Sequence, residues 1–183
     1  MTLVQTLFAS PVGDLGLIAS DHGLVAILWE NDDLDRVRLP QRNICDDHPI
    51  LDQAQTQLAG YFAGTRQHFS LPLDWRGTIF QRRVWAMLLT IPYGETRSYG
   101  DIARAIGHPA ASRAVGAANG RNPLSIIAPC HRVVGANGAL TGFAAGVETK
   151  RWLLDFERRI KAYTARSGAE EAGDAGNGVG QGD

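Results

Sequence analysis

The spacing of the apolar residues changes once along the chain, and this change limits the possible folds more than any other feature. The first thirty residues contain three short runs rich in apolar and β-branched residues, separated by Pro11-Val12-Gly13 and His22-Gly23. These runs, LVQTLFAS, DLGLIAS and LVAILWEN, predict an antiparallel meander of strands. After Thr78 the apolar residues recur at helical spacing, as Phe80, Val84, Met87, Leu88 and Ile91. A sheet followed by helices predicts an α+β fold.

The chain divides into two domains and a tail. We expect a small antiparallel sheet domain over residues 1–75 and a mostly helical domain over residues 76–163. After Ser167 the composition falls to Gly, Ala and acidic residues, which cannot bury enough apolar surface to fold. Residues 164–183 are therefore predicted to form a disordered, acidic, glycine-rich tail.

Local signals place further elements inside the two domains. Residues 31–47 are polar and acidic, so they predict a loop. Residues 49–63 and 148–163 carry apolar side chains near helical spacing, so each predicts a helix. Thr78 is a suitable N-cap for the helix that follows it.

Two short helices in the second domain suggest a DNA-binding motif. Ser98 and Asp101 resemble a capping box, and the helix that they begin is expected to reach Gly107. A second short helix is predicted from about 110 to 119. Two short helices joined by a turn that contains glycine, in a basic region, predict a helix-turn-helix domain.

The charge is distributed unevenly, although the whole chain has a net charge of −1. Residues 1–75 contain 4 Arg, no Lys and 10 acidic residues, whereas residues 76–161 contain 13 basic and 5 acidic residues. This asymmetry is consistent with a basic module that binds a polyanion, and equally with basic residues that only solvate helix faces.

Cysteine usage and hydropathy exclude several classes of protein. Cys45 and Cys130 are too few for a disulfide framework or a four-ligand zinc site, so we expect a reducing compartment and no metal or other cofactor. The N-terminus lacks the pattern of a signal peptide, and no run of 18 apolar residues occurs. The sequence predicts a cytoplasmic protein without a membrane partner.

The stretch IIAPCHRVVG predicts a reactive thiol at Cys130. A thiol needs a base to become a nucleophile near neutral pH, and His131 is adjacent. Neighbouring side chains rarely face each other, so we expect His131 to act through a bridging water. Glu157 is the candidate to orient the far side of the imidazole, although the pattern alone favours an exposed surface glutamate. Pro129 restricts the backbone before the thiol, and Asn122 can brace it.

PCHRV at 129–133, with SRAVGAANGRNP at 112–123 and GALTGFAAG at 138–146, resembles the O6-alkylguanine-DNA alkyltransferase family. SPVGDLGL at 10–17 agrees more loosely. The resemblance implies a ribonuclease H-like first domain and a winged-helix second domain that carries the active site. It also implies single-turnover DNA repair, in which a flipped-out O6-alkylguanine, and possibly O4-alkylthymine, gives its alkyl group irreversibly to a cysteine.

The same resemblance implies a role for each matching residue. Cys130 is the acceptor, His131 its base, and Glu157 the residue that orients His131. Asn122 braces the site. The remaining matches contact the DNA: Tyr99 would bind the flipped guanine, Arg113 would be the finger that fills the vacated stack, and the backbone of Val133 and Ala144, with Phe143 nearby, would line the pocket.

The predicted second helix, AASRAVGAANG, is unsuited to reading base edges because it offers mostly Ala and Gly. Small residues allow the backbone to approach the minor groove of double-stranded DNA, with affinity from phosphates and no sequence preference. We expect a monomer in solution, with cooperative assembly on DNA left open.

Three other functions are compatible with parts of the sequence. A transcription regulator would use the helix-turn-helix with a structural cysteine, but the Ala/Gly-rich helix argues against it. In alkyltransferase-like lesion-binding proteins tryptophan replaces the cysteine, so Cys130 argues against that class. A Cys-His hydrolase would need an oxyanion hole, and nothing in the sequence indicates an acyl substrate.

Overall fold

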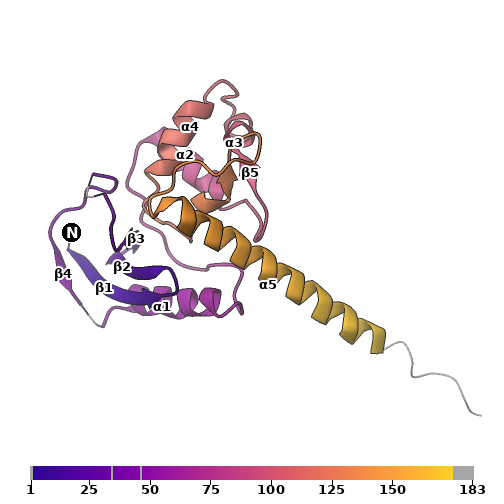
Figure 1. Cartoon of the computed structure of the whole chain (residues 1–183). Helices are drawn as coiled ribbons and strands as arrows, with labels where there is room; N and C mark the ends of the chain where they lie inside the picture. Colours follow the sequence, from indigo (N-terminus) through magenta and orange to yellow (C-terminus); the bar gives the residue numbers. More distant parts are fainter. Residues whose placement is uncertain (1, 34, 46, 175–183) are drawn as a thin grey trace, which may run out of the picture.

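The computed structural model describes residues 2–33, 35–45 and 47–174, with side chains as far as Ser167. In Figure 1 a sheet with one helix beneath it forms the first domain, and a cluster of short helices forms the second. A long C-terminal helix runs beside both domains and projects beyond them. This arrangement confirms the expected α+β architecture.

The first domain is built on four strands in the order β3-β2-β1-β4. Strands β1 (Leu3–Ser10), β2 (Gly13–Ser20) and β3 (Gly23–Trp29) form the predicted antiparallel meander, with Thr6 opposite Leu17 and Leu17 opposite Ile27. Strand β4 (Arg42–Ile44) pairs in parallel with β1. Two predictions therefore need correction, because the sheet is mixed and residues 31–47 are not wholly a loop. Strand β4 has only three residues and polar neighbours, so its sequence shows no alternation of apolar and polar residues that would predict a strand.

Helix α1 (Pro49–Phe62) packs against the sheet through the apolar side chains that its helical spacing predicted. Its Pro49 lies in the first turn, where the missing N–H costs no helical hydrogen bond. Leu51, Ala54, Leu58 and Tyr61 are all buried in the main core, which continues without a break into the second domain.

The second domain begins with two capped helices. Helix α2 (Ile79–Leu88) has Thr78 as its N-cap, in a capping box with Gln81, and α3 (Tyr99–Ala105) has the predicted capping box of Ser98 and Asp101. Helix α4 (Ser112–Gly120) follows without a side-chain cap. Trp85 of α2 donates its indole N–H to the Ala118 carbonyl at 2.8 Å, which fixes α4 against α2.

The segment around the cysteine contains little regular structure. Residues Cys130–Arg132 form one turn of 3₁₀ helix, η1, which leads into the two-residue strand β6 (Val133–Val134). Strand β6 pairs in parallel with β5 (Arg97–Ser98), directly before α3. This pairing ties the end of the cysteine segment to the start of the helix-turn-helix.

The last helix, α5 (Gly146–Asp174), is longer than the predicted 148–163. It begins at Gly146, whose φ of +84° favours glycine, and it continues into the predicted disordered tail, where residues 164–174 are helical. Ala and Glu in AEEAG are good helix formers, which explains the extension. Residues 175–183 lie outside the described part, so disorder there stays a prediction. No helix in the described ranges is both long enough and apolar enough to cross a membrane.

Candidate active site

Asn122 holds together the loop that leads to Cys130. Its side-chain oxygen accepts the amide of Leu124 at 3.0 Å, and its side-chain nitrogen donates to the carbonyl of Ala128 at 2.7 Å. The amide of Ala128 also donates to the Leu124 carbonyl at 2.8 Å. One buried amide therefore joins both ends of the turn from 124 to 128, which agrees with the bracing position expected for Asn122.

The backbone between Ile126 and Cys130 is tightly restricted. Ile126 is fully buried with a φ of +73°, a left-handed conformation that a β-branched residue rarely adopts. Such a conformation costs roughly 1–3 kcal/mol, and the surrounding contacts must offset it. Pro129 then takes φ −78° and ψ 69°, and the Cys130 amide donates to the Ala128 carbonyl at 2.7 Å. This is an inverse γ-turn, and it sets the direction of the cysteine side chain.

The first domain anchors the start of the same loop. The amide of Ile27 in β3 donates to the Pro123 carbonyl at 2.8 Å. The guanidinium of Arg36 hydrogen-bonds to the carbonyl of Asn122 and, at 3.0 Å, to that of Ile27, while it forms a buried ion pair with Asp32. Sequence reasoning missed Arg36, because an arginine in an acidic loop gives no signal of contacts so far along the chain.

The thiol of Cys130 lies beneath the surface, with 3% of the residue exposed. Burial raises the pKa of Cys130, because the apolar surroundings disfavour the thiolate. Hydrogen bonds from the side chains of Asn122 and Ser125 and the charges of Arg36 and Lys150 oppose that rise. The surroundings thus contain several groups that favour a thiolate once its proton has been removed.

His131 follows Cys130 in the same 3₁₀ turn and is fully buried. Its Nε2 is 2.7 Å from Oε1 of Glu157 on α5, so the two residues that the sequence analysis paired are in contact. Nδ1 is buried and has no hydrogen-bond partner among the described residues. Burial lowers the pKa of His131, with Glu157 acting in the opposite direction. Burial thus favours the neutral imidazole, and Nδ1 is the ring nitrogen that does not contact Glu157.

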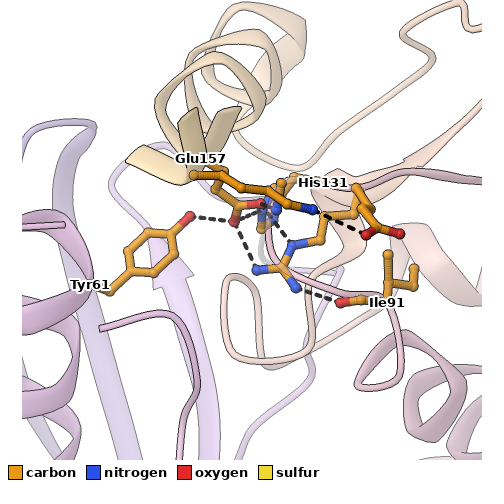
Figure 2. A network of polar contacts seen from close by, with 8 residues as sticks. Tyr61, Ile91, His131 and Glu157 are labelled. Carbon is orange, nitrogen blue, oxygen red and sulfur yellow. Dashed lines mark hydrogen bonds and ion pairs between the residues drawn. The ribbon is translucent and has the colours of Figure 1, made fainter. Parts of the chain in front are cut away.

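Glu157 is the centre of a buried polar cluster (Figure 2). Besides His131, Arg132 donates to both carboxylate oxygens at 2.9 Å, the Tyr61 hydroxyl donates to Oε1 at 2.8 Å, and the Gly94 amide donates to Oε2 at 3.0 Å. Gly94 reaches this position with a φ of +71°, which explains the glycine in PYG. Burial alone would raise the pKa of Glu157, but His131 and Arg132 outweigh it and hold the pKa far below its ordinary value. Glu157 is a buried carboxylate, not the exposed glutamate that the sequence allowed as an alternative.

Lys150 lies about two turns before Glu157 on α5. It is a second buried charge that sequence reasoning did not find. Its Nζ donates to the carbonyl of Val133 at 2.6 Å and to that of Thr141 at 3.2 Å, and lies 6.0 Å from the centre of the Tyr99 ring. Burial lowers the pKa of Lys150, and the charge on Cys130 opposes this. Lys150 therefore joins β6 to the loop that follows it and adds positive charge near the thiol.

A groove of about 620 Å³ lies between α3, α4 and the loop after β6. Tyr99 and Arg113 both line it, with the small residues Gly116 and Gly120 of α4 and Thr141 opposite them. The Tyr99 hydroxyl is 2.9 Å from that of Thr141, and Arg113 is exposed. The groove thus combines an aromatic hydroxyl, an arginine and a smooth helix face.

The other predicted pocket residues lie around the same loop. Phe143 packs edge-on against Trp29 of β3, with ring centres 5.5 Å apart, and Ala144 lies beside it along a second hollow of about 340 Å³. The Trp29 indole donates to Ser125 at 3.2 Å. The Val133 carbonyl accepts from Lys150, as described above. The pocket loop is therefore supported by a tryptophan from the first domain.

Comparison with known proteins identifies the family. The family model described as "6-O-methylguanine DNA methyltransferase, ribonuclease-like domain" matches residues 3–75, and that described as "6-O-methylguanine DNA methyltransferase, DNA binding domain" matches residues 79–159. The methylated-DNA–protein-cysteine methyltransferase of Mycobacterium bovis is 51% identical over 150 residues, which cover 81% of this chain and 88% of the relative. The constitutive enzyme of Bacillus subtilis is 48% identical over 156 residues, which cover 84% and 94%.

A solved structure agrees with the sequence relatives. The crystal structure of Mycobacterium tuberculosis OGT in complex with DNA superposes with a TM-score of 0.76 at 46% identity, and the match covers 87% of this chain and 94% of that chain. The two family models together span both domains. The chain therefore belongs to the methylated-DNA–protein-cysteine methyltransferase family.

Proposed function

We propose that this protein repairs DNA by taking an alkyl group from the O6 atom of guanine onto Sγ of Cys130, once per molecule. The carbon–sulfur bond forms as the carbon–oxygen bond breaks, the thiol proton passes to His131, and the guanine leaves with the bonding electrons on O6. The observation that carries this proposal is a buried thiol next to an imidazole whose Nε2 lies 2.7 Å from the carboxylate of Glu157.

His131 acts as the base through its Nδ1, by way of one bridging water. A proton received at Nδ1 makes the imidazole cationic, and the carboxylate of Glu157 stabilises that cation. A thiolate suits this reaction because an alkyl carbon is a soft electrophile. Asn122 holds the loop, and the positive charges of Arg36 and Lys150 favour the thiolate.

The damaged base reaches the thiol by leaving the double helix. Cys130 is buried, so a base that remains stacked cannot approach its sulfur. Helix α4 enters the minor groove with its small residues, Gly116 and Gly120 among them, and binds without sequence preference. Arg113, exposed on the same helix, fills the gap that the base leaves.

The groove next to α4 receives the base. The Tyr99 hydroxyl binds the leaving guanine as negative charge develops on it. The backbone of Val133 and Ala144 lines the edges of the base, and Phe143 lies beside Ala144 along the neighbouring hollow. O4-alkylthymine carries the same kind of alkyl–oxygen bond and is a second substrate. The protein acts in the cytoplasm as a monomer and uses no cofactor; several copies can assemble cooperatively on DNA.

A stoichiometric transfer experiment tests this function. The protein is incubated with duplex DNA that contains one O6-[³H-methyl]guanine, and the label on the protein is followed until it reaches a plateau. We expect one label per protein, with a mass increase of one methyl group on the peptide that contains Cys130. Label that accumulates beyond one equivalent would indicate a turnover enzyme, and unmodified protein beside unrepaired DNA would exclude alkyl transfer.

A further inference from the structure

The catalytic carboxylate is held partly by a residue of the other domain. Tyr61 lies in the last turn of α1, in the first domain, and its hydroxyl donates to Oε1 of Glu157 at 2.8 Å. Both side chains are fully buried. Figure 2 shows the Tyr61 hydroxyl directed at the Glu157 carboxylate from the side opposite Ile91. This is a hydrogen bond across the domain boundary into the proposed proton-transfer site.

Tyr61 and His131 use the same oxygen. Oε1 accepts from the Tyr61 hydroxyl at 2.8 Å, from Nε2 of His131 at 2.7 Å and from Arg132 at 2.9 Å. Three donors on one carboxylate oxygen share its negative charge, so each limits how strongly the others are bound. Removing the tyrosine donor leaves more of that charge to His131.

We propose that Tyr61 is a positioning residue for the alkyl transfer, which sets how strongly Glu157 holds His131 and so keeps the imidazole neutral and able to accept the thiol proton. This inference rests on the proposed function, because it concerns the proposed base. It makes the first domain a part of the chemistry, in addition to its contacts with the loop at Asn122.

The hydroxyl of Tyr61 can serve only as a neutral donor. Burial, followed by the charge of Glu157, raises the pKa of Tyr61 well above 10. Its ring is fixed by the aromatic rings around it, with centres 5.1–6.0 Å away. These rings are Phe62, Phe69, Tyr93 and Phe156. Packing therefore determines where the hydroxyl lies, and Tyr61→Phe keeps that packing while it removes the donor.

Charged and titratable groups from several elements surround the Glu157–His131 pair. Arg132 acts on the pair from η1, Lys150 from α5, Tyr61 from α1, and Tyr93 from the loop after α2. Tyr93 is buried, and its ring contacts the ring of Tyr61 and the guanidinium of Arg132. Its hydroxyl has no hydrogen-bond partner within the described ranges. Tyr93→Phe thus removes an equally buried hydroxyl that does not bind Glu157.

The experiment measures transfer from a free O6-alkylguanine base between pH 5 and 9, which separates chemistry from DNA binding. In Tyr61→Phe we expect the acidic midpoint of the rate profile to rise by roughly half a unit to one unit, the equivalent of one hydrogen bond. NMR titration of the His131 ring, assigned with His131→Gln, should show the same rise. Tyr93→Phe should match the unmodified protein in both measurements.

Fluorinated tyrosine provides the opposite change without loss of any contact. Fluorination makes a phenol a stronger donor, so in fully labelled protein both midpoints should fall, and labelled Tyr61→Phe should not show this decrease. Equal midpoints in Tyr61→Phe and the unmodified protein, or equal shifts in both phenylalanine variants, would overturn the inference. If no alkyl group is transferred at all, the proposed function fails, whereas the NMR titration still decides the role of Tyr61.

Discussion

The cluster around Glu157 and the exposed face of α4 are built in opposite ways. Glu157 is fully buried and accepts hydrogen bonds from two arginine nitrogens, a tyrosine, a histidine and a backbone amide. Helix α4 presents small residues and the exposed Arg113, and its N-terminus has no side-chain cap. The cluster is fixed before any substrate arrives, whereas the helix face leaves room for a second molecule. Chemistry and DNA binding should therefore respond differently to mutation.

The largest effect should come from the sulfur itself. Cys130→Ser replaces the soft nucleophile with a hydroxyl that the same base activates poorly, so methyl transfer should become undetectable while duplex binding remains within about twofold. Mass spectrometry and fluorescence anisotropy measure the two quantities. Cys45→Ser is the matched control, because its thiol lies in the first domain, where it donates to the Asp47 carbonyl. Loss of DNA binding in Cys130→Ser would show a structural cysteine.

Glu157→Gln should damage the buried cluster but not the helix face. It leaves Arg132 without its anion, so we expect a loss of roughly 3 kcal/mol in the free energy of unfolding. Transfer should slow by about 100-fold on both duplex DNA and a free O6-alkylguanine base. Glu148→Gln, on the same helix but exposed and paired with Arg151, is the control. A defect restricted to duplex DNA would place Glu157 outside the chemistry.

Arg113→Ala should show the reverse selectivity. Transfer from duplex DNA should slow by about tenfold, since part of the cost of unstacking is no longer recovered, while transfer from the free base should be unchanged. Single-turnover rates on the two substrates test this. Arg158→Ala removes the same charge from an exposed position on α5 and should change neither rate. Equal slowing on both substrates would remove the finger role.

Acidification should affect the cluster through stability. The pKa of His131 is lowered from 6.5, mainly by burial, so the folded protein binds fewer protons there than the unfolded chain. Stability must then fall as the pH falls below about 6.5, by roughly 1 kcal/mol between pH 7 and 5.5. Urea unfolding at the two pH values measures this. In His131→Gln the free energy of unfolding should lose this part of its pH dependence. If the variant and the unmodified protein lose the same stability between the two pH values, His131 titrates normally.

Short-range signals in the sequence predicted the fold well. Thr78, Ser98 and Asp101 are the caps that their spacing indicated, because a capping box is confined to four residues. Strand β4 escaped notice because it has three residues and takes its stability from β1. The extension of α5 was missed because the Gly-, Ala- and acid-rich composition after Ser167 suggested disorder, although the Ala and Glu residues there also have high helix propensity.

The site was predicted less completely, and the missing residues Tyr61 and Arg36 share one property. Tyr61 is 96 positions from Glu157, and Arg36 is 86 positions from Asn122. In the sequence Tyr61 is one more residue on the buried stripe of a helix, and nothing local tells where its hydroxyl points. Lys150 is different, because its partners Val133 and Thr141 are only 17 and 9 positions away, but a single lysine on a helix gives no local sign of burial. Residues near the thiol were accessible through the motif, whereas contacts between domains arise only on folding.

Lys150 and Glu157 are seven residues apart on α5, so they lie on nearly the same side of one continuous helix, about 10 Å apart along its axis. Lys150 binds the carbonyl of Val133, which we propose lines the base pocket, and Glu157 binds His131, the proposed proton acceptor. The helix therefore fixes the distance between Lys150 and Glu157, and so between the groups that they bind. A distortion within those two turns would displace the contacts to Val133 and to His131 together, even if every side chain in the site were kept.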